Sequence, residues 1–335
     1  MRITKNLLHK FASETVKQRK RSEPDLHAAY IMGSILSDQP LLGGTTDIDL
    51  MLVHRYLAPT PRETVAITPE ISLDIFHKTR EDYEPVRQFR QDPWIGYPLT
   101  YNHILLFDTD HWLEYIQSSI TAEFHREDNV VARVNVFLSA ARDHWRTMMT
   151  APPQEHLDWL DQFLHALEMG ANAISGLIGP PLTERRFMMT FTQRLDNLGI
   201  PDVRTGFCGL LGCKNLSNEH YAPWINSFEQ DLIHLAEKPN HPPHLSIPRL
   251  GYYVQAFRAL ADSDDPALLS WPLLRTWLDI QLAEDGKSPG NEAWQAFLET
   301  LQLTEDTSEG KTEALDSYLD HLDVLIESWA DRYAY

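Results

Sequence analysis

The hydrophobic pattern of this chain of 335 residues changes its period near residue 120. Before that point, short apolar runs alternate with turn residues, which is typical of strands. These runs cover residues 28–32, 48–53, 65–67, 71–76 and 104–107, after an amphipathic helical pattern over residues 3–19. After that point, apolar residues recur at three- and four-residue steps, which indicates helices. We therefore predict an α+β fold, with a mixed-sheet domain over residues 1–120 and an all-helical domain over residues 121–335.

Composition excludes several classes of protein. No run of about twenty apolar residues is present, so we expect no membrane span, and residues 1–21 are too basic and too interrupted by polar residues for a signal peptide. Cys208 and Cys213 are the only cysteines, which excludes a disulfide framework. We therefore expect a cytoplasmic protein.

One series of residues in the first domain is of the types that bind metal ions and ligands. The apolar run 28–32 leads directly into Gly33 and Ser34, and the next apolar run contains Asp47 and Asp49. A third carboxylate, Asp74, stands alone within a later apolar run.

The spacing of Asp47 and Asp49 has a physical consequence. Side chains alternate between the two faces of a strand, so both carboxylates project to one side while Ile48, Leu50 and Leu52 form the opposite, core-facing row. Two such carboxylates repel each other in apolar surroundings unless a cation neutralises them. Oxygen ligands of this kind suit Mg²⁺, which completes its coordination with water and substrate phosphates. The pattern therefore predicts a magnesium site.

This ordered series resembles the nucleotidyltransferases of the DNA polymerase beta superfamily. Within that superfamily it is most similar to the kanamycin (aminoglycoside) nucleotidyltransferase type, in which an apolar strand ending in Asp precedes an all-helical domain. The likeness extends over roughly residues 25–180 and includes the runs 92–100 and 104–108. It implies a nucleotidyltransferase domain at the N-terminus and a helical substrate-binding domain after it.

The resemblance also implies roles for individual residues. Asp47 and Asp49 would hold Mg²⁺ against a nucleoside triphosphate, for which we expect ATP. Asp74 would complete the cation site or lie beside the acceptor hydroxyl. Ser34 and the backbone of Gly33 would hold the β- and γ-phosphates.

A general base is expected on a helix of the second domain, where the kanamycin type has a Glu-aromatic-Ala-Gly-Lys stretch. Glu168 falls at a comparable place, although it also fits an exposed acid on a helix face. Asn172 stands where the family has a lysine that contacts phosphate. Arg185 and Arg186 are the candidates to supply that charge, with solvated helix charges as the alternative.

The formal net charge of −19 bears on the partners. Nucleic acid binding relies on Lys and Arg that displace counterions, so a nucleic acid partner is disfavoured, whereas small cations are attracted. We predict transfer of AMP from ATP to a hydroxyl of a small, amine-bearing molecule, with release of pyrophosphate. A toxin–antitoxin-type enzyme that modifies a protein or tRNA and a nucleotide-binding scaffold without catalysis are the alternatives. Whether a homodimer completes the site stays open.

Overall fold

The computed structural model describes residues 3–100, 103–151, 155–213 and 216–333, which divide into two compact units. The first unit runs up to His125 and also includes Pro242–Ala256. The second unit consists of Arg126–His241 and of the chain from Phe257 onward. A short segment from the second half of the sequence therefore belongs to the first unit.

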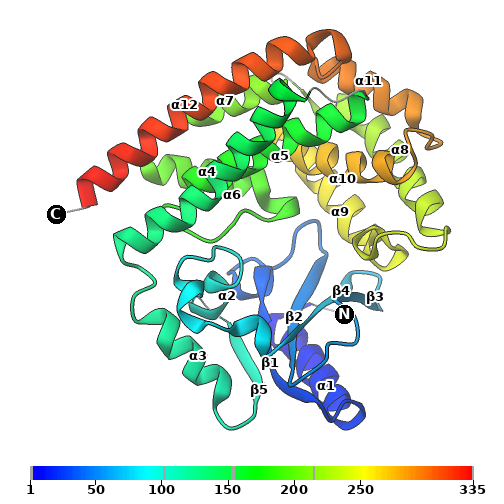
Figure 1. Cartoon of the computed structure of the whole chain (residues 1–335). Coiled ribbons are helices and arrows are strands. Elements are labelled where there is room, and N and C mark those ends of the chain that lie inside the picture. Colours follow the sequence, from blue (N-terminus) through cyan, green and yellow to red (C-terminus); the bar gives the residue numbers. More distant parts are fainter. Residues whose placement is uncertain (1–2, 101–102, 152–154, 214–215, 334–335) are drawn as a thin grey trace. The chain divides into compact units, whose positions relative to one another are not determined.

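A five-stranded sheet forms the centre of the first unit, with strand order β3-β4-β2-β1-β5 (Figure 1). Its strands are β1 (Leu26–Met32), β2 (Thr46–His54), β3 (Arg62–Thr68), β4 (Ile71–Thr79) and β5 (Ile104–Asp108). Strands β2 and β4 run parallel, and the other neighbours run antiparallel. The prediction of a mixed sheet is therefore confirmed.

Helix α1 (Lys5–Ser22) covers one face of this sheet (Figure 1). The Thr4 side chain caps its N-terminus by accepting a hydrogen bond from the amide of Leu7. Its buried stripe of Leu8, Ala12 and Val16 packs in one apolar cluster with the row that the β2 pattern predicts, Ile48, Leu50 and Leu52. The alternation of β2 therefore turns its aspartates away from α1.

The opposite face of the sheet is covered by helices α2 (Gly96–Thr100) and α3 (Trp112–Thr121). Met51 and Val53 of β2 lie in this second apolar cluster, in the same row as Asp47 and Asp49. The carboxylate of Asp108 accepts hydrogen bonds from the first amides of α3, so the acid that ends β5 starts the next helix. The aspartates of β2 therefore extend an otherwise apolar row.

The second unit is built from helices, and no strand is found among its described residues. The helices are α4 (Glu127–Thr150), α5 (His156–Ser175), α6 (Phe187–Leu198), α7 (Asp202–Leu211), α8 (Asn218–Ala236), α9 (Leu250–Ala261), α10 (Ser270–Ala283), α11 (Asn291–Leu301) and α12 (Ser308–Tyr333). Helix α9 begins in the first unit and ends in the second. The predicted α+β class, a sheet domain followed by a largely helical region, is confirmed.

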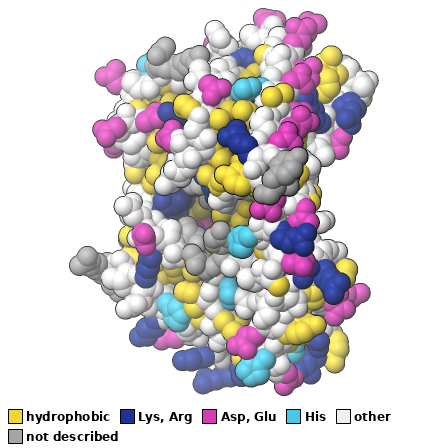
Figure 2. Space-filling model, turned by 90° about the vertical axis from the view of Figure 1, so that its left-hand side faces the viewer, with side chains coloured by type: hydrophobic (Ala, Val, Ile, Leu, Met, Phe, Trp, Pro, Cys, Tyr) yellow, Lys and Arg dark blue, Asp and Glu magenta, His cyan; other side chains and the backbone are white. Residues whose placement is uncertain are grey.

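Two further observations concern the whole described chain. No helix in the described ranges has both the length and the apolar character that a membrane span requires. On the face drawn in Figure 2, acidic and basic side chains lie among one another, so that face carries no continuous acidic field despite the net charge of −19.

Candidate functional site

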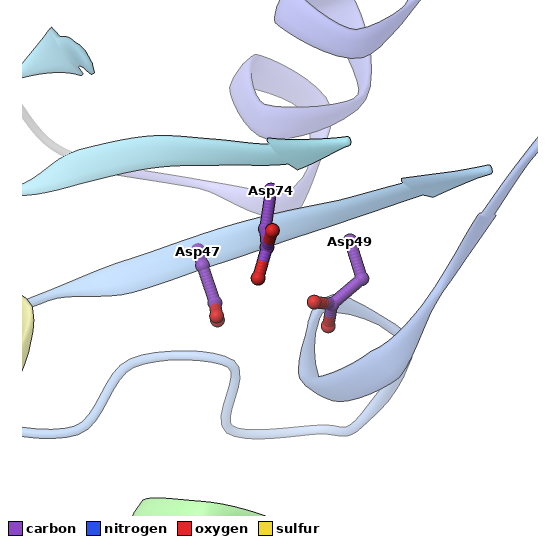
Figure 3. A group of neighbouring side chains, drawn as sticks. All are labelled: Asp47, Asp49 and Asp74. Atoms are coloured by element: carbon purple, nitrogen blue, oxygen red, sulfur yellow. The ribbon is translucent and has the colours of Figure 1, made fainter. Parts of the chain in front are cut away.

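Strand register brings the three aspartates of the first unit together. Asp49 of β2 lies directly opposite Asp74 of the parallel strand β4, and Asp47 stands two residues earlier on the same face. One carboxylate oxygen from each residue lies within 4.8 Å of the others. Figure 3 shows the three side chains projecting to one side of the strands, with Asp74 between the other two in that view. The predicted convergence is confirmed, and the roles of the residues stay predictions.

Gly33 lets the carboxylate of Asp49 sit against the backbone at the end of β1. Its φ angle is +78°, in the left-handed region that favours glycine. A Cβ atom on Gly33 would lie 1.7 Å from Oδ2 of Asp49. The glycine therefore makes room for a carboxylate of the triad, in addition to the approach of a ligand that the sequence predicts.

Ser34 follows in the short 3-10 helix η1 (Gly33–Leu36). Its hydroxyl oxygen is buried and finds no hydrogen-bond partner among the residues that the structure describes. A buried hydroxyl without a partner is costly, and a phosphate oxygen would satisfy it. Ser34 is therefore suited to the phosphate-binding role that we predict for it.

Two arginines contact the aspartates, and the sequence analysis did not identify either of them. Arg62 of β3 donates from Nε to Oδ1 of Asp74 at 2.8 Å and from Nη2 to Oδ2 at 2.5 Å. Arg249 donates from Nη1 to Oδ2 of Asp74 at 2.8 Å and to Oδ2 of Asp47 at 3.2 Å. Both aspartates and Arg249 are almost fully buried. These two guanidinium groups thus contact two of the three carboxylates, those of Asp47 and Asp74.

The two arginines differ in the signal that the sequence offers. Arg62 stands three residues before the apolar run 65–67, so its strand begins earlier than the hydrophobic pattern indicates. Extending that strand backward by three residues would have included it. Arg249 lies 175 residues beyond Asp74 in the chain, in the 3-10 helix η6 (Ile247–Arg249), and no local pattern links the two.

The donor set fits a hard divalent cation. Three carboxylates present oxygens within 4.8 Å of one another, which is an all-oxygen donor set. Mg²⁺ prefers oxygen ligands and is held by one or two protein carboxylates together with substrate phosphates. The Asp74 carboxylate already accepts three hydrogen bonds from arginine, which leaves it little capacity to bind a cation as well.

Glu168 lies in α5 of the second unit, and only 24% of its side chain is exposed. It is therefore not an exposed acid on a helix face. Burial raises the pKa of its carboxyl group, and the nearby Arg275, whose Nε lies 3.9 Å from Oε2 of Glu168, partly opposes that effect. A carboxylate with a raised pKa is a stronger base than an ordinary one.

Asn172 has a structural role in the second unit. Its Nδ2 donates to the carbonyl oxygen of Glu168 at 3.0 Å, and its Oδ1 accepts from the amide of Leu182 at 2.7 Å. This fixes the loop that leads into the 3-10 helix η4 (Glu184–Arg186). Arg185 is buried there and Arg186 is half-buried, so neither is a fully solvated helix charge. Their phosphate-binding roles stay predictions.

Comparison with known proteins adds little to this geometry. The chain matches no protein-family model and no curated protein sequence. Among solved structures it is similar to a nucleotidyltransferase-like protein from Exiguobacterium sibiricum 255-15, with 11% identity over 83% of this chain and 92% of the other, at a TM-score of 0.34. Because this overlap is loose, the function has to come from the site itself.

Proposed function

We propose that this protein is a Mg²⁺-dependent nucleotidyltransferase that moves AMP from ATP to a hydroxyl of a small, amine-bearing molecule. The observation that carries the proposal is the meeting of Asp47, Asp49 and Asp74 on one face of the sheet, within 4.8 Å, beside the Gly33–Ser34 turn. Three clustered carboxylates close to a turn with an unsatisfied buried hydroxyl suit a cation and a phosphate chain together.

The reaction forms one bond and breaks another at the α-phosphorus of ATP. The acceptor oxygen bonds to this phosphorus, the bond to the bridging oxygen breaks, and pyrophosphate leaves. Mg²⁺ held by Asp47 and Asp49 would supply Lewis acidity toward the phosphate oxygens. Ser34 would donate a hydrogen bond to the phosphates from its hydroxyl, and Arg185 or Arg186 would add positive charge.

A base must accept the proton that the acceptor hydroxyl releases. We assign this role to Glu168, because the resemblance places the base there and because the raised pKa of its carboxyl group makes it more basic. The amine-bearing class of acceptor follows from the charge of −19, which attracts small cations.

The test is incubation of the purified protein with ATP labelled at the α-phosphate, Mg²⁺ and a panel of amine-bearing and neutral hydroxyl compounds. We expect label on an amine-bearing compound and one pyrophosphate released for each transfer. Asp49→Asn, a variant of nearly the same shape without the charge, should abolish both signals. A folded protein that transfers no label would contradict the proposal, and label on a protein or tRNA would favour the toxin–antitoxin alternative.

A further inference from the structure

Arg249 reaches the aspartates from a segment that is docked on the first unit by its backbone. The hydroxyl of Thr64 donates to the carbonyl oxygen of Pro243 at 3.3 Å. At the other end of the segment, a Cβ atom on Gly43 would lie 2.1 Å from the carbonyl oxygen of Gln255. Contacts on both sides of Arg249 therefore fix the place from which its side chain enters the site.

The guanidinium of Arg249 lies in a built environment. It is 1% exposed, it bridges Asp47 and Asp74, and its Cζ lies 4.1 Å from the centre of the Tyr252 ring. Such a ring face favours a cation. The position therefore resembles a cation site whose cation is a side chain of the protein.

The hydrogen bonds of Asp74 limit what else it can bind. Its Oδ2 accepts from both Arg62 and Arg249, which uses both lone pairs of that atom, and its Oδ1 accepts from Arg62. A metal ion bound to Oδ2 would have to displace a guanidinium. Without bound nucleotide, two divalent ions together with two arginines would also carry twice the positive charge that three carboxylates can neutralise.

We infer that this site takes one divalent cation, held by Asp47 and Asp49, and that Arg249 supplies the second positive charge. In two-metal sites, a second ion about 3.5–4 Å away provides that charge. Asp74 is then a positioning residue, because it holds Arg62 and Arg249 in place. The identity of the nucleotide in this inference rests on the proposed function. The number of bound metal ions does not.

The experiment counts bound Mn²⁺, used as the probe for Mg²⁺, through the electron paramagnetic resonance signal of the free ion. The full-length protein is titrated with Mn²⁺ alone and again at saturating α,β-methylene-ATP. We expect one Mn²⁺ per chain without nucleotide and one per bound analogue. Two Mn²⁺ per chain or per bound analogue would overturn the inference.

Variants of Arg249 test its part directly. Arg249→Gln removes the charge and should admit a second Mn²⁺, whereas Arg249→Lys keeps a charge and should leave the count at one. A count of one in folded Arg249→Gln would overturn the assignment. Should Arg249→Gln fail to fold, Asp74→Asn and Asp49→Asn decide the matter. We expect Asp49→Asn to lose at least about ten times more Mn²⁺ affinity than Asp74→Asn, and equal losses would overturn the inference.

Failure of the inference and failure of the proposed function give different results. An enzyme that binds two Mn²⁺ and transfers label contradicts only the single-cation site. A protein that binds one Mn²⁺, does not bind the analogue and transfers no label contradicts only the proposed nucleotidyl transfer.

Discussion

Single residues set the geometry of the acidic site, and Gly33 is the clearest case. Its position requires both a left-handed backbone and the absence of a side chain, since Asp49 occupies the space where a Cβ atom would lie. Glycine meets both requirements without strain. The glycine of the Gly-Ser pair is therefore needed, first of all, because the Asp49 carboxylate lies against it.

Gly33→Ala should lower label transfer about a hundredfold, because a shift of a catalytic group by about 1 Å has an effect of this size. Gly44→Ala is the matched control, since Gly44 has a φ angle of +77° and a Cβ atom there meets nothing within 4 Å. Both variants carry backbone strain of about 1–2 kcal/mol. Only Gly33→Ala moves Asp49, so equal transfer rates in the two variants would refute this account.

The raised pKa of Glu168 predicts how stability depends on pH. The folded protein binds the Glu168 proton more tightly than the unfolded chain does, so this carboxyl group lowers stability as pH rises from the unfolded pKa through the folded one. The loss is complete above the folded pKa. Glu168→Gln cannot ionise, so we expect its urea midpoint to fall less than that of the wild type as the pH rises from about 4, near the pKa of an unperturbed Glu.

The same variant separates stability from catalysis. If Glu168 is the base, Glu168→Gln should lower kcat by about 10²–10⁴-fold with little effect on the KM for ATP. Glu313→Gln, at an exposed position of α12, is the control for both measurements. If the urea midpoint of Glu168→Gln falls as steeply with rising pH as that of the wild type, the Glu168 carboxyl group is not the cause of the pH dependence.

At the scale of elements, the second unit is tied together by a buried acid. Asp231 of α8 accepts from Nε1 of Trp277 at 2.7 Å and from the hydroxyl of Ser288 at 2.7 Å. It also accepts from Nε2 of Gln281 at 3.3 Å and from the amide of Gly290 at 2.6 Å. One carboxylate thus joins α8, α10 and the turn that precedes α11.

Asp231→Asn should destabilise the protein by about 3 kcal/mol or more, because it places an NH₂ group among donors and leaves buried groups unsatisfied. Urea unfolding followed by tryptophan fluorescence measures this. The control is Asp262→Asn, at an exposed position just after α9, which should change stability by less than about 0.5 kcal/mol. A loss below about 1 kcal/mol in Asp231→Asn would contradict the bridging role.

At the scale of the whole molecule, the hydrophobic period predicts the elements well and the long-range contacts poorly. Every strand expected from the short apolar runs is present, since an apolar run bounded by turn residues is a signal of the local sequence. Arg249 could not be found from the sequence, since only the folded chain brings it to Asp74. The alternation of side chains along a strand predicts that Asp47 and Asp49 share a face, but it does not predict whether a metal ion or an arginine side chain lies next to them.

The path of the chain predicts how the two units unfold. Pro242–Ala256 belongs to the first unit while the residues on both sides of it belong to the second, and α9 continues from one unit into the other. Loss of either unit therefore removes support from this segment, and with it from Arg249, Asp47 and Asp74. Breaking a buried ion pair costs about 3–5 kcal/mol. We therefore expect the first unit not to outlast the second, and unfolding to occur in one transition.

Two signals can follow this transition separately. Trp94 and Trp112 lie in the first unit and the remaining tryptophans in the second, so fluorescence reports chiefly on the second unit, whereas release of bound Mn²⁺ reports on the first. The two melting curves should coincide, and the calorimetric enthalpy should equal the van't Hoff enthalpy. Arg249→Lys keeps a charge but loses the bridging geometry, so it should lower both midpoints together. Release of Mn²⁺ in a separate, later transition would show that the first unit holds its aspartates together without Arg249.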